Sequence, residues 1–481
     1  MKTTVIKTYP GPISHLRRLL FGSLLLTAFL WSACEKLIEV PKAGNLILSK
    51  DVFSGNETAT SAVMGLYSKM VTLNLSMSNG GLSVYSGLSA DELLNPAQSS
   101  SYDPFSGNML LSSNGIISNN IWSTAYRNIY QANAILEGLA SSNSLSTATK
   151  KQLTGETLTI RAFYLFYLVN LFGDIPLTLT SNFEQNAVMP RTSSAIVYAQ
   201  IIKDLEEAKV LLTANYPSSA KARPNLFAAR ALLARVYLYS QRWAEAEAEA
   251  SSVISSGLYN MEPDLNKTFL NTSNETIWQL VRETANTAEA AILIPSSGIV
   301  VPPLVIRDNL LNEFEAGDLR KSRWLSSNIV NGVSYSYPYK YKIRANSTVS
   351  ESLIVLRLAE QYLIRAEARL AQDNLGGAVS DLNMVRTRAR ATATPAITNP
   401  LPNLSTILTK AELTEAIFHE RQIELFCEWG HRWLDLKRSG RVDQKLTGLK
   451  PNWKPFMALY PIPFPETQTN IFLTQNPGYE N

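Results

Sequence analysis

The chain has 481 residues, of which 45% are hydrophobic and 17% are charged. This length and composition can build one large domain or several smaller ones with real hydrophobic cores, so wholesale disorder is excluded. Four basic residues before residue 34 (Lys2, Lys7, Arg17 and Arg18) account for the formal charge of +4, since the remainder has equal numbers of basic and acidic side chains. A neutral body lacks the positive field that nucleic-acid binding needs, so we expect no RNA or DNA partner.

Residues 1–33 have the features of an export signal. The apolar run from Leu19 to Trp31 follows basic residues and is too short to span a bilayer, which takes about 20 residues. Ser32 and Ala33 then precede Cys34, which resembles a bacterial lipobox except that Trp31 replaces the usual Leu. We expect removal of the signal, acylation of Cys34 and a body of residues 34–481 tethered by lipid. An ordinary signal with an incidental cysteine is the alternative.

The body is predicted to be mainly helical. Between Ser194 and Thr213 apolar residues recur every three or four positions, which is typical of a helix with one buried face. Two segments, residues 225–257 and 356–390, have the spacing of tetratricopeptide repeats. Because these repeats are degenerate and separated by long insertions, the sequence predicts a helical scaffold with irregular loops.

Two long segments between the helices are predicted to be irregular. Residues 76–120 are rich in Ser and Gly, and residues 283–346 contain Asn331-Gly332, a type I′ hairpin signal. Tyrosines at positions 335, 337, 339 and 341 alternate after this turn and are expected to share one face of a strand. Long loops in a compact domain are commonly functional.

Catalytic signals are few. His419 begins a run like that of a zinc-protease helix, but Ile423 stands where the second histidine must be, so we expect no metal site. Cys427 lies among apolar residues and is expected to be a buried, inert thiol. The adjacent acids Asp91 and Glu92 fit solvated loop positions better than glycoside hydrolysis. We therefore predict no catalytic residues, no cofactor and no enzymatic activity.

Several segments resemble the SusD/RagB family of outer-membrane lipoproteins, along the whole chain and in the family order. They are RAFYLFYLVNLFGDIPL from Arg161, PRTSSAIVYAQIIKDLEEA from Pro190, NEFEAGDLRKSRW from Asn312, EAIFHERQIELFCEWGHRWLDLKRSGR from Glu415 and LYPIPFPETQTNIFLTQNPGY from Leu459. The resemblance implies a single domain, residues 34–481, with four tetratricopeptide-like helix pairs, long irregular loops and minor β-hairpins. It also implies an outer-membrane protein that faces the cell exterior and delivers oligosaccharides, or in some members peptides, to a SusC-like TonB-dependent transporter.

The family motifs themselves are expected to be structural. Trp433, Asp435 and Arg438 share a predicted helix with nearby Arg432, and we interpret them as a packed polar network. Asp174, at a helix-ending turn, is expected to satisfy backbone donors. The ligand should therefore meet the variable loops, where no residue-by-residue transfer from the family is possible.

Sugar binding requires flat aromatic faces for the apolar sugar surfaces and polar groups for the hydroxyls. The two long segments supply candidates of both kinds: Tyr85, Asp91, Tyr102, Phe105, Trp324, Tyr335 and Tyr337. Tyr102 and Trp324 are the preferred stacking partners, and the alternative for each aromatic residue is packing within its own loop. Peptides could use the same aromatic residues. An envelope scaffold that binds only protein partners, or a secreted hydrolase, would be the competing functions.

Overall fold

The computed structural model describes residues 3–6, 49–345 and 348–479. The chain divides into two units, residues 1–51 and residues 52–481, and the fold lies in the second. Cys34 and all of the predicted signal segment except residues 3–6 lie outside the described residues. No helix of the described ranges combines the length and apolarity needed to cross a membrane.

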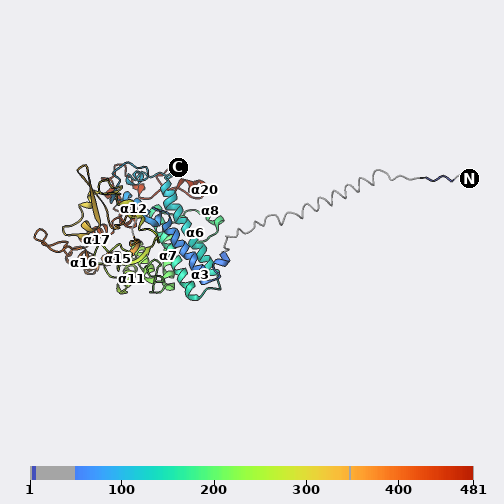
Figure 1. Cartoon of the computed structure of the whole chain (residues 1–481), viewed down its shortest axis with the longest axis horizontal. Coiled ribbons are helices and arrows are strands. Elements are labelled where there is room, and N and C mark those ends of the chain that lie inside the picture. Colours follow the sequence, from blue (N-terminus) through green and yellow to red (C-terminus); the bar gives the residue numbers. More distant parts are fainter. Residues whose placement is uncertain (1–2, 7–48, 346–347, 480–481) are drawn as a thin grey trace. The chain divides into compact units, whose positions relative to one another are not determined.

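The described part of the chain is mainly helical, which confirms the predicted fold class (Figure 1). The α-helices are α2 (Ser49–Val52), α3 (Asn56–Thr72), α4 (Gly87–Ser89), α5 (Asp103–Ser106), α6 (Ser123–Ser141), α7 (Thr147–Phe172), α8 (Phe183–Ala187), α9 (Ser194–Leu211), α10 (Leu226–Tyr239), α11 (Trp243–Ser255), α12 (Ala288–Leu293), α13 (Asp308–Leu311), α14 (Leu319–Arg323), α15 (Leu358–Ala371), α16 (Leu375–Ala389), α17 (Lys410–Leu425), α18 (His431–Arg438), α19 (Val442–Leu446) and α20 (Phe464–Thr469). The described ranges also contain two π-helical segments and one 3₁₀ turn: η1 (Met77–Ser86), η2 (Ile117–Trp122) and η3 (Pro455–Ala458).

Two helix pairs are joined by the same kind of turn. α10 packs on α11 and α15 packs on α16, each pair across a short connection. The middle residue of each connection, Gln241 or Asp373, has a left-handed backbone with φ of 56° or 62°. In both turns the next residue donates its N–H over 2.9 Å to the carbonyl five residues earlier, which caps the first helix as in a Schellman motif. These pairs coincide with the two segments predicted from tetratricopeptide spacing.

Helix α7 lies at the centre of the helical core. It packs against α3, α6, α9 and α10, and Figure 1 shows it beside α3 and α6. Almost every side chain from Leu153 to Phe172 is buried. A helix that is surrounded in this way carries apolar residues on several faces, which explains why the segment shows little helical amphipathicity in sequence. Its buried charges are paired, Arg161 with Asp204 and Glu156 with Arg223.

Within residues 49–345 and 348–479, three antiparallel two-stranded sheets lie among the helices: β1 (Leu93–Leu94) with β3 (Val305–Ile306), β2 (Thr276–Leu280) with β6 (Leu353–Arg357), and β4 (Leu325–Val330) with β5 (Val333–Pro338). The hairpin of β4 and β5 turns at Asn331 and Gly332, whose φ values of 52° and 79° are those that a type I′ turn requires. The predicted hairpin is therefore confirmed. Because β5 ends at Pro338, only the first two of the four alternating tyrosines lie in the strand.

The Ser/Gly-rich segment differs from its prediction as a wholly irregular loop. Its first part forms η1 and α4, and every residue from Met77 to Ser89 is buried. Small side chains permit this packing: a Cβ at Gly81 would lie 2.5 Å from the carbonyl oxygens of Leu75 and Ser76. Ser and Gly here allow two stretches of backbone to approach closely. A Ser/Gly-rich composition is also typical of flexible loops, so composition alone does not distinguish the two cases.

Candidate functional site

The two long segments predicted to carry the ligand do meet. β1 comes from the first segment and β3 from the second, with Leu93 paired to Ile306. Arg307 reinforces the junction, since its backbone N–H donates to the carbonyl of Glu92 at 2.9 Å and its Nε donates to the carbonyl of Leu93 at 3.0 Å. The amide of Asn309 adds a third bond, to the carbonyl of Asp91 at 3.0 Å. β3 also packs on β5, so the hairpin lies beside this junction.

Asp91 does not face a ligand. Its two carboxylate oxygens accept hydrogen bonds of 2.7 Å from Nε and Nη2 of Arg432, and both side chains are buried. Burial alone would raise the pKa of Asp91, but the hydrogen bonds and charge of Arg432 lower it below its usual value. The prediction of a sugar-binding carboxylate at this position is therefore wrong, because the charge is already neutralised within the protein.

Tyr85 and Phe105 stack on each other rather than on a ligand. Their ring centroids are 4.6 Å apart with planes inclined by 26°, and Phe105 also meets the edge of Tyr460. Both rings are buried, with Phe105 at 0% exposure. They are core residues beneath the first segment, which corrects their predicted role as ligand contacts.

Trp324 is likewise enclosed, at 0% exposure. Its indole N–H donates to the carbonyl of Leu265 at 3.0 Å, and the ammonium of Lys340 lies 4.7 Å from its ring centroid. A ring with a satisfied N–H and no exposed face has nothing to offer a sugar, so its selection as a preferred stacking partner is wrong. Tyr337 is also buried, against Tyr339 at 6.1 Å between centroids.

Tyr102 and Tyr335 are the two aromatic candidates that keep partial exposure. Tyr102 precedes α5 in a turn shaped by Asp103, whose carboxylate accepts from the side chain of Asn95 at 2.7 Å and the N–H of Ser99 at 2.8 Å. Tyr335 lies on β5 opposite Asn328. The amide of Asn328 donates to two carbonyls of the 297–300 loop, at 2.8 and 2.7 Å, and so fixes that loop beside the hairpin.

The family motifs form a buried polar network, as predicted. The carboxylate of Asp435 accepts from Arg421 at 2.7 Å and from Arg438 at 2.8 Å, and Arg438 also pairs with Glu367 at 2.5 Å. A second network joins Arg357 to Glu424, at 2.6 Å, and to two further glutamates. Asp174 accepts from the N–H of Ser194 at 2.8 Å, which satisfies a donor at the start of α9. These contacts hold helices together and occupy the charged groups of Asp435, Arg438, Arg357 and Asp174 within the protein.

The remaining reactive residues are occupied or enclosed. Nε2 of His419 lies 2.9 Å from the carbonyl oxygen of Glu313. The Cys427 thiol is buried, and burial together with the nearby Glu92 raises its pKa well above the usual value, so it is not a nucleophile at neutral pH. Across the described ranges, no three His, Cys, Asp or Glu side chains are grouped as a metal site would need.

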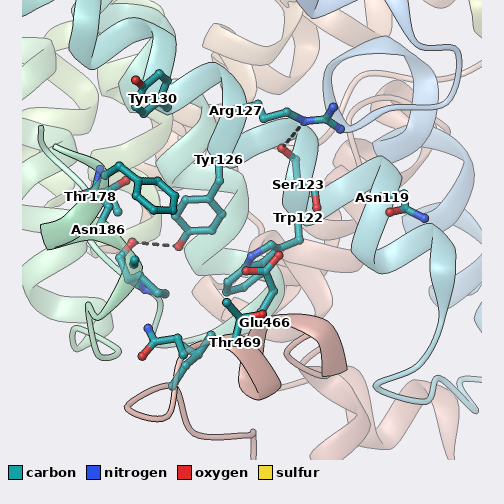
Figure 2. A pocket seen from close by; sticks show the side chains of 15 residues that line it. Asn119, Trp122, Ser123, Tyr126, Arg127, Tyr130, Thr178, Asn186, Glu466 and Thr469 are labelled. Carbon is teal, nitrogen blue, oxygen red and sulfur yellow. Dashed lines mark hydrogen bonds between the residues drawn. The ribbon is translucent and has the colours of Figure 1, made fainter. Parts of the chain in front are cut away.

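The structure also contains an aromatic pocket of about 660 Å³ that was not predicted from the sequence (Figure 2). Three of its lining residues, Trp122, Tyr126 and Tyr130, follow one another at four-residue intervals through the start of α6. This spacing places the three rings on one face of a helix, and it was the one feature of the sequence that could have indicated the pocket. The same pattern is typical of a helix face buried in an ordinary core. These three residues differ from a core stripe in their exposure, because Trp122 is buried, Tyr126 is half-buried and Tyr130 is 48% exposed.

Comparison with known proteins identifies the family. Residues 90–238 match a family model described as "Starch-binding associating with outer membrane", and residues 321–479 match the SusD family model. SusD-like protein P2 of Formosa agariphila is 30% identical over 424 residues, which cover 76% of this chain and 81% of that protein. SusD-like protein P25 of the same organism is 26% identical and covers 93% of this chain and 96% of its own length.

Solved structures agree with these sequence relatives. A SusD superfamily protein from Bacteroides vulgatus superposes with a TM-score of 0.76 at 22% identity, covering 88% of this chain and 99% of that one. A laminarin-binding SusD-like protein superposes with a TM-score of 0.71 at 23% identity, with coverage of 88% and 99%. At these identities the superpositions show a shared fold. Together with the relative at 30% identity, they lead to one conclusion: the chain belongs to the SusD/RagB family.

Proposed function

We propose that the protein is a non-catalytic surface lipoprotein that binds oligosaccharides and delivers them to a SusC-like TonB-dependent transporter in the outer membrane. The observation that carries the proposal is membership of the SusD/RagB family, and the laminarin-binding neighbour supports a glycan as the ligand class.

The proposed ligand surface is the junction of β1, β3 and the hairpin, with Tyr102 and Tyr335 as stacking residues. Both rings are partly exposed, and internal hydrogen bonds from Asn95 to Asp103 and from Asn328 to the 297–300 loop hold the chain beside them in place. An exposed ring offers a flat face for the apolar surface of a sugar. Isothermal titration with laminarihexaose and maltoheptaose tests this surface. Tyr102→Ala and Tyr335→Ala should each weaken binding by roughly tenfold to a hundredfold, as loss of one aromatic anchor does. Val333→Ala is the matched control, because it is exposed on the same strand and offers no flat face.

Two outcomes of these titrations would contradict the proposal. Binding of an oligopeptide library with no binding of either sugar would favour the peptide-delivering alternative. Binding of neither class would favour a scaffold that contacts only other envelope proteins. Overnight incubation followed by mass analysis of the sugars should return them unchanged, and products that increase with protein concentration would identify a hydrolase instead.

The anchor is proposed from sequence, since Cys34 lies outside the described residues. Wild-type cells fed a labelled fatty acid should incorporate it into the protein, whereas Cys34→Ala should abolish the label and release the protein from membranes or leave an uncleaved precursor. Surface exposure is tested by protease treatment of intact cells. Co-purification of the wild-type protein with a TonB-dependent barrel from solubilised outer membranes tests the transport partner, and a protein that is recovered alone would contradict it.

A further inference from the structure

The pocket of Figure 2 lies between three segments that are far apart in sequence. α6 forms one wall, the chain from Pro176 through α8 to Ala187 forms a second, and α20 with Asn470 and Leu473 forms the third. Its volume of about 660 Å³ is in the range of small-molecule binding sites. None of the predicted ligand residues of the loop segments lines it, so it is a separate feature of the surface.

The aromatic residues of this pocket become more exposed from its floor to its rim. Trp122 forms part of the floor, with its ring 4.8 Å from that of Tyr126. Tyr130, on α6, is 48% exposed and Phe183, on α8, is 77% exposed. Large exposed rings that line one pocket are costly to hydrate, and each provides a flat platform on which an apolar ring face can lie.

The walls are fixed before any ligand arrives. The Tyr126 hydroxyl donates to the carbonyl of Pro176 at 2.9 Å, and the amide of Asn133 donates to the carbonyl of Thr178 at 3.0 Å. One helical turn further along α6, Glu137 accepts from the N–H of Ser181 at 2.8 Å. On the third wall, the amide of Asn470 donates to the carbonyl of Met189 at 2.8 Å. A pocket held by bonds from successive turns of one helix loses little conformational entropy on binding.

Polar groups line the same space with balanced charge. Arg127 contributes a guanidinium, anchored through a 3.0 Å bond from its Nε to the carbonyl of Ser123, and Glu466 contributes a carboxylate. Figure 2 shows Glu466 beside Trp122. Burial raises the pKa of Glu466, so this carboxyl is poorly solvated and gains from a ligand hydroxyl that donates to it. Asn119 and Asn186 add amides.

We propose that this pocket is a second oligosaccharide-binding site, in which Tyr130 and Phe183 hold the apolar faces of a neutral sugar chain while Arg127 and Glu466 bind its hydroxyls. The ligand class rests on the proposed function, and the site rests on the pocket geometry. One guanidinium opposite one carboxylate favours a neutral glycan over an acidic one. The position on α6, separate from the β1–β3 junction, means that the two sites can fill independently.

The test is calorimetric titration of the full-length protein with laminarihexaose and with maltoheptaose. The wild-type protein should bind two molecules of one of these sugars, and the double substitution Tyr130→Ala with Phe183→Ala should reduce this to one. Both rings are exposed, so the melting temperature should not change. Phe472→Ala is the matched control, because this phenylalanine is 53% exposed on the same C-terminal segment but does not line the pocket. It should retain two binding events.

The complementary variant, Tyr102→Ala with Tyr335→Ala, separates this site from the proposed loop surface. In that background one weak binding event should remain, and adding Tyr130→Ala with Phe183→Ala should lower its association constant at least tenfold. Unchanged binding after loss of Tyr130 and Phe183 would overturn the pocket proposal and leave the proposed function intact. A wild-type protein that binds neither sugar would overturn both.

Discussion

Arg432 donates two hydrogen bonds of 2.7 Å, from Nε and Nη2, to the carboxylate of Asp91, and both side chains are buried. This contact joins α18, which belongs to the most distinctive sequence motif of the chain, to the segment just before β1. The pair thus ties the α18 motif to the segment that leads into β1. The arginine supplies the charge that the buried carboxylate needs, and the carboxylate positions the strand that pairs with β3.

Asp91→Ala should therefore lower the free energy of unfolding by about 3–5 kcal/mol, because it leaves the guanidinium of Arg432 buried and unpaired. Chemical denaturation measures this value. The matched control is Glu415→Ala, which breaks the bidentate pair with Arg441 on a carboxylate whose side chain is 69% exposed. An exposed pair is worth at most about 1 kcal/mol. Equal losses in the two variants would contradict the assignment of Asp91 to structure.

Trp324→Ala should destabilise the protein by about 3–5 kcal/mol, because it removes a fully buried ring and leaves a cavity. Sugar affinity, measured under conditions where the variant is folded, should stay close to that of the wild type. Trp324→Phe should recover part of the stability, since it restores ring volume but not the bond to Leu265. A large loss of affinity with normal stability would show that the ring reaches the ligand.

More of the fold than of the ligand site could be predicted from the sequence. Local patterns decide local structure, so the periodicity of residues 194–213 predicted α9 and Asn331-Gly332 predicted the hairpin. Burial of a loop residue depends instead on contacts distant in sequence: Asp91 meets Arg432, and Trp324 meets Leu265. No local pattern carries that information. For the same reason the aromatic residues of the pocket resembled a core stripe, because the walls that enclose them come from the 176–187 segment and the C-terminal segment, both distant in sequence.

Two helical glycines should respond in opposite ways to substitution by alanine. In α7, a Cβ at Gly155 would lie 2.6 Å from Cγ of Leu212, so Gly155→Ala must separate α7 from the end of α9 and should cost about 1–3 kcal/mol. In α3, a Cβ at Gly65 would meet only the amide end of Gln131, at 3.8 Å. Gly65→Ala should therefore stabilise by about 0.5–1 kcal/mol. Thermal melting distinguishes the two, and destabilisation by both would mean that α3 packs more tightly than described.

The last prediction concerns Glu289, a buried acid beneath the hairpin. Its Oε1 accepts a 2.6 Å hydrogen bond from Ser83, and its surroundings include Lys340 and Glu428. Burial raises the pKa of Glu289 to about 8, with the charge of Glu428 adding to the rise and Ser83 and Lys340 opposing it. In the unfolded chain a glutamate titrates near 4.3. Between these two pH values the folded state therefore holds a proton that the unfolded state has released.

The proton on Glu289 therefore contributes to the free energy of unfolding of the wild type. This contribution is fully present below about pH 4.3 and is lost as the pH rises towards 8. Glu289→Gln keeps the acceptor for Ser83 but does not titrate, so its free energy of unfolding relative to the wild type should increase by roughly 2–5 kcal/mol from pH 5 to pH 8. Denaturation at several pH values measures the difference. Glu245→Gln is the control: its pKa is lowered by Arg242, so it should show no such gain in this window. Parallel pH profiles for the wild type and Glu289→Gln would mean that Glu289 is ionised in the folded protein throughout.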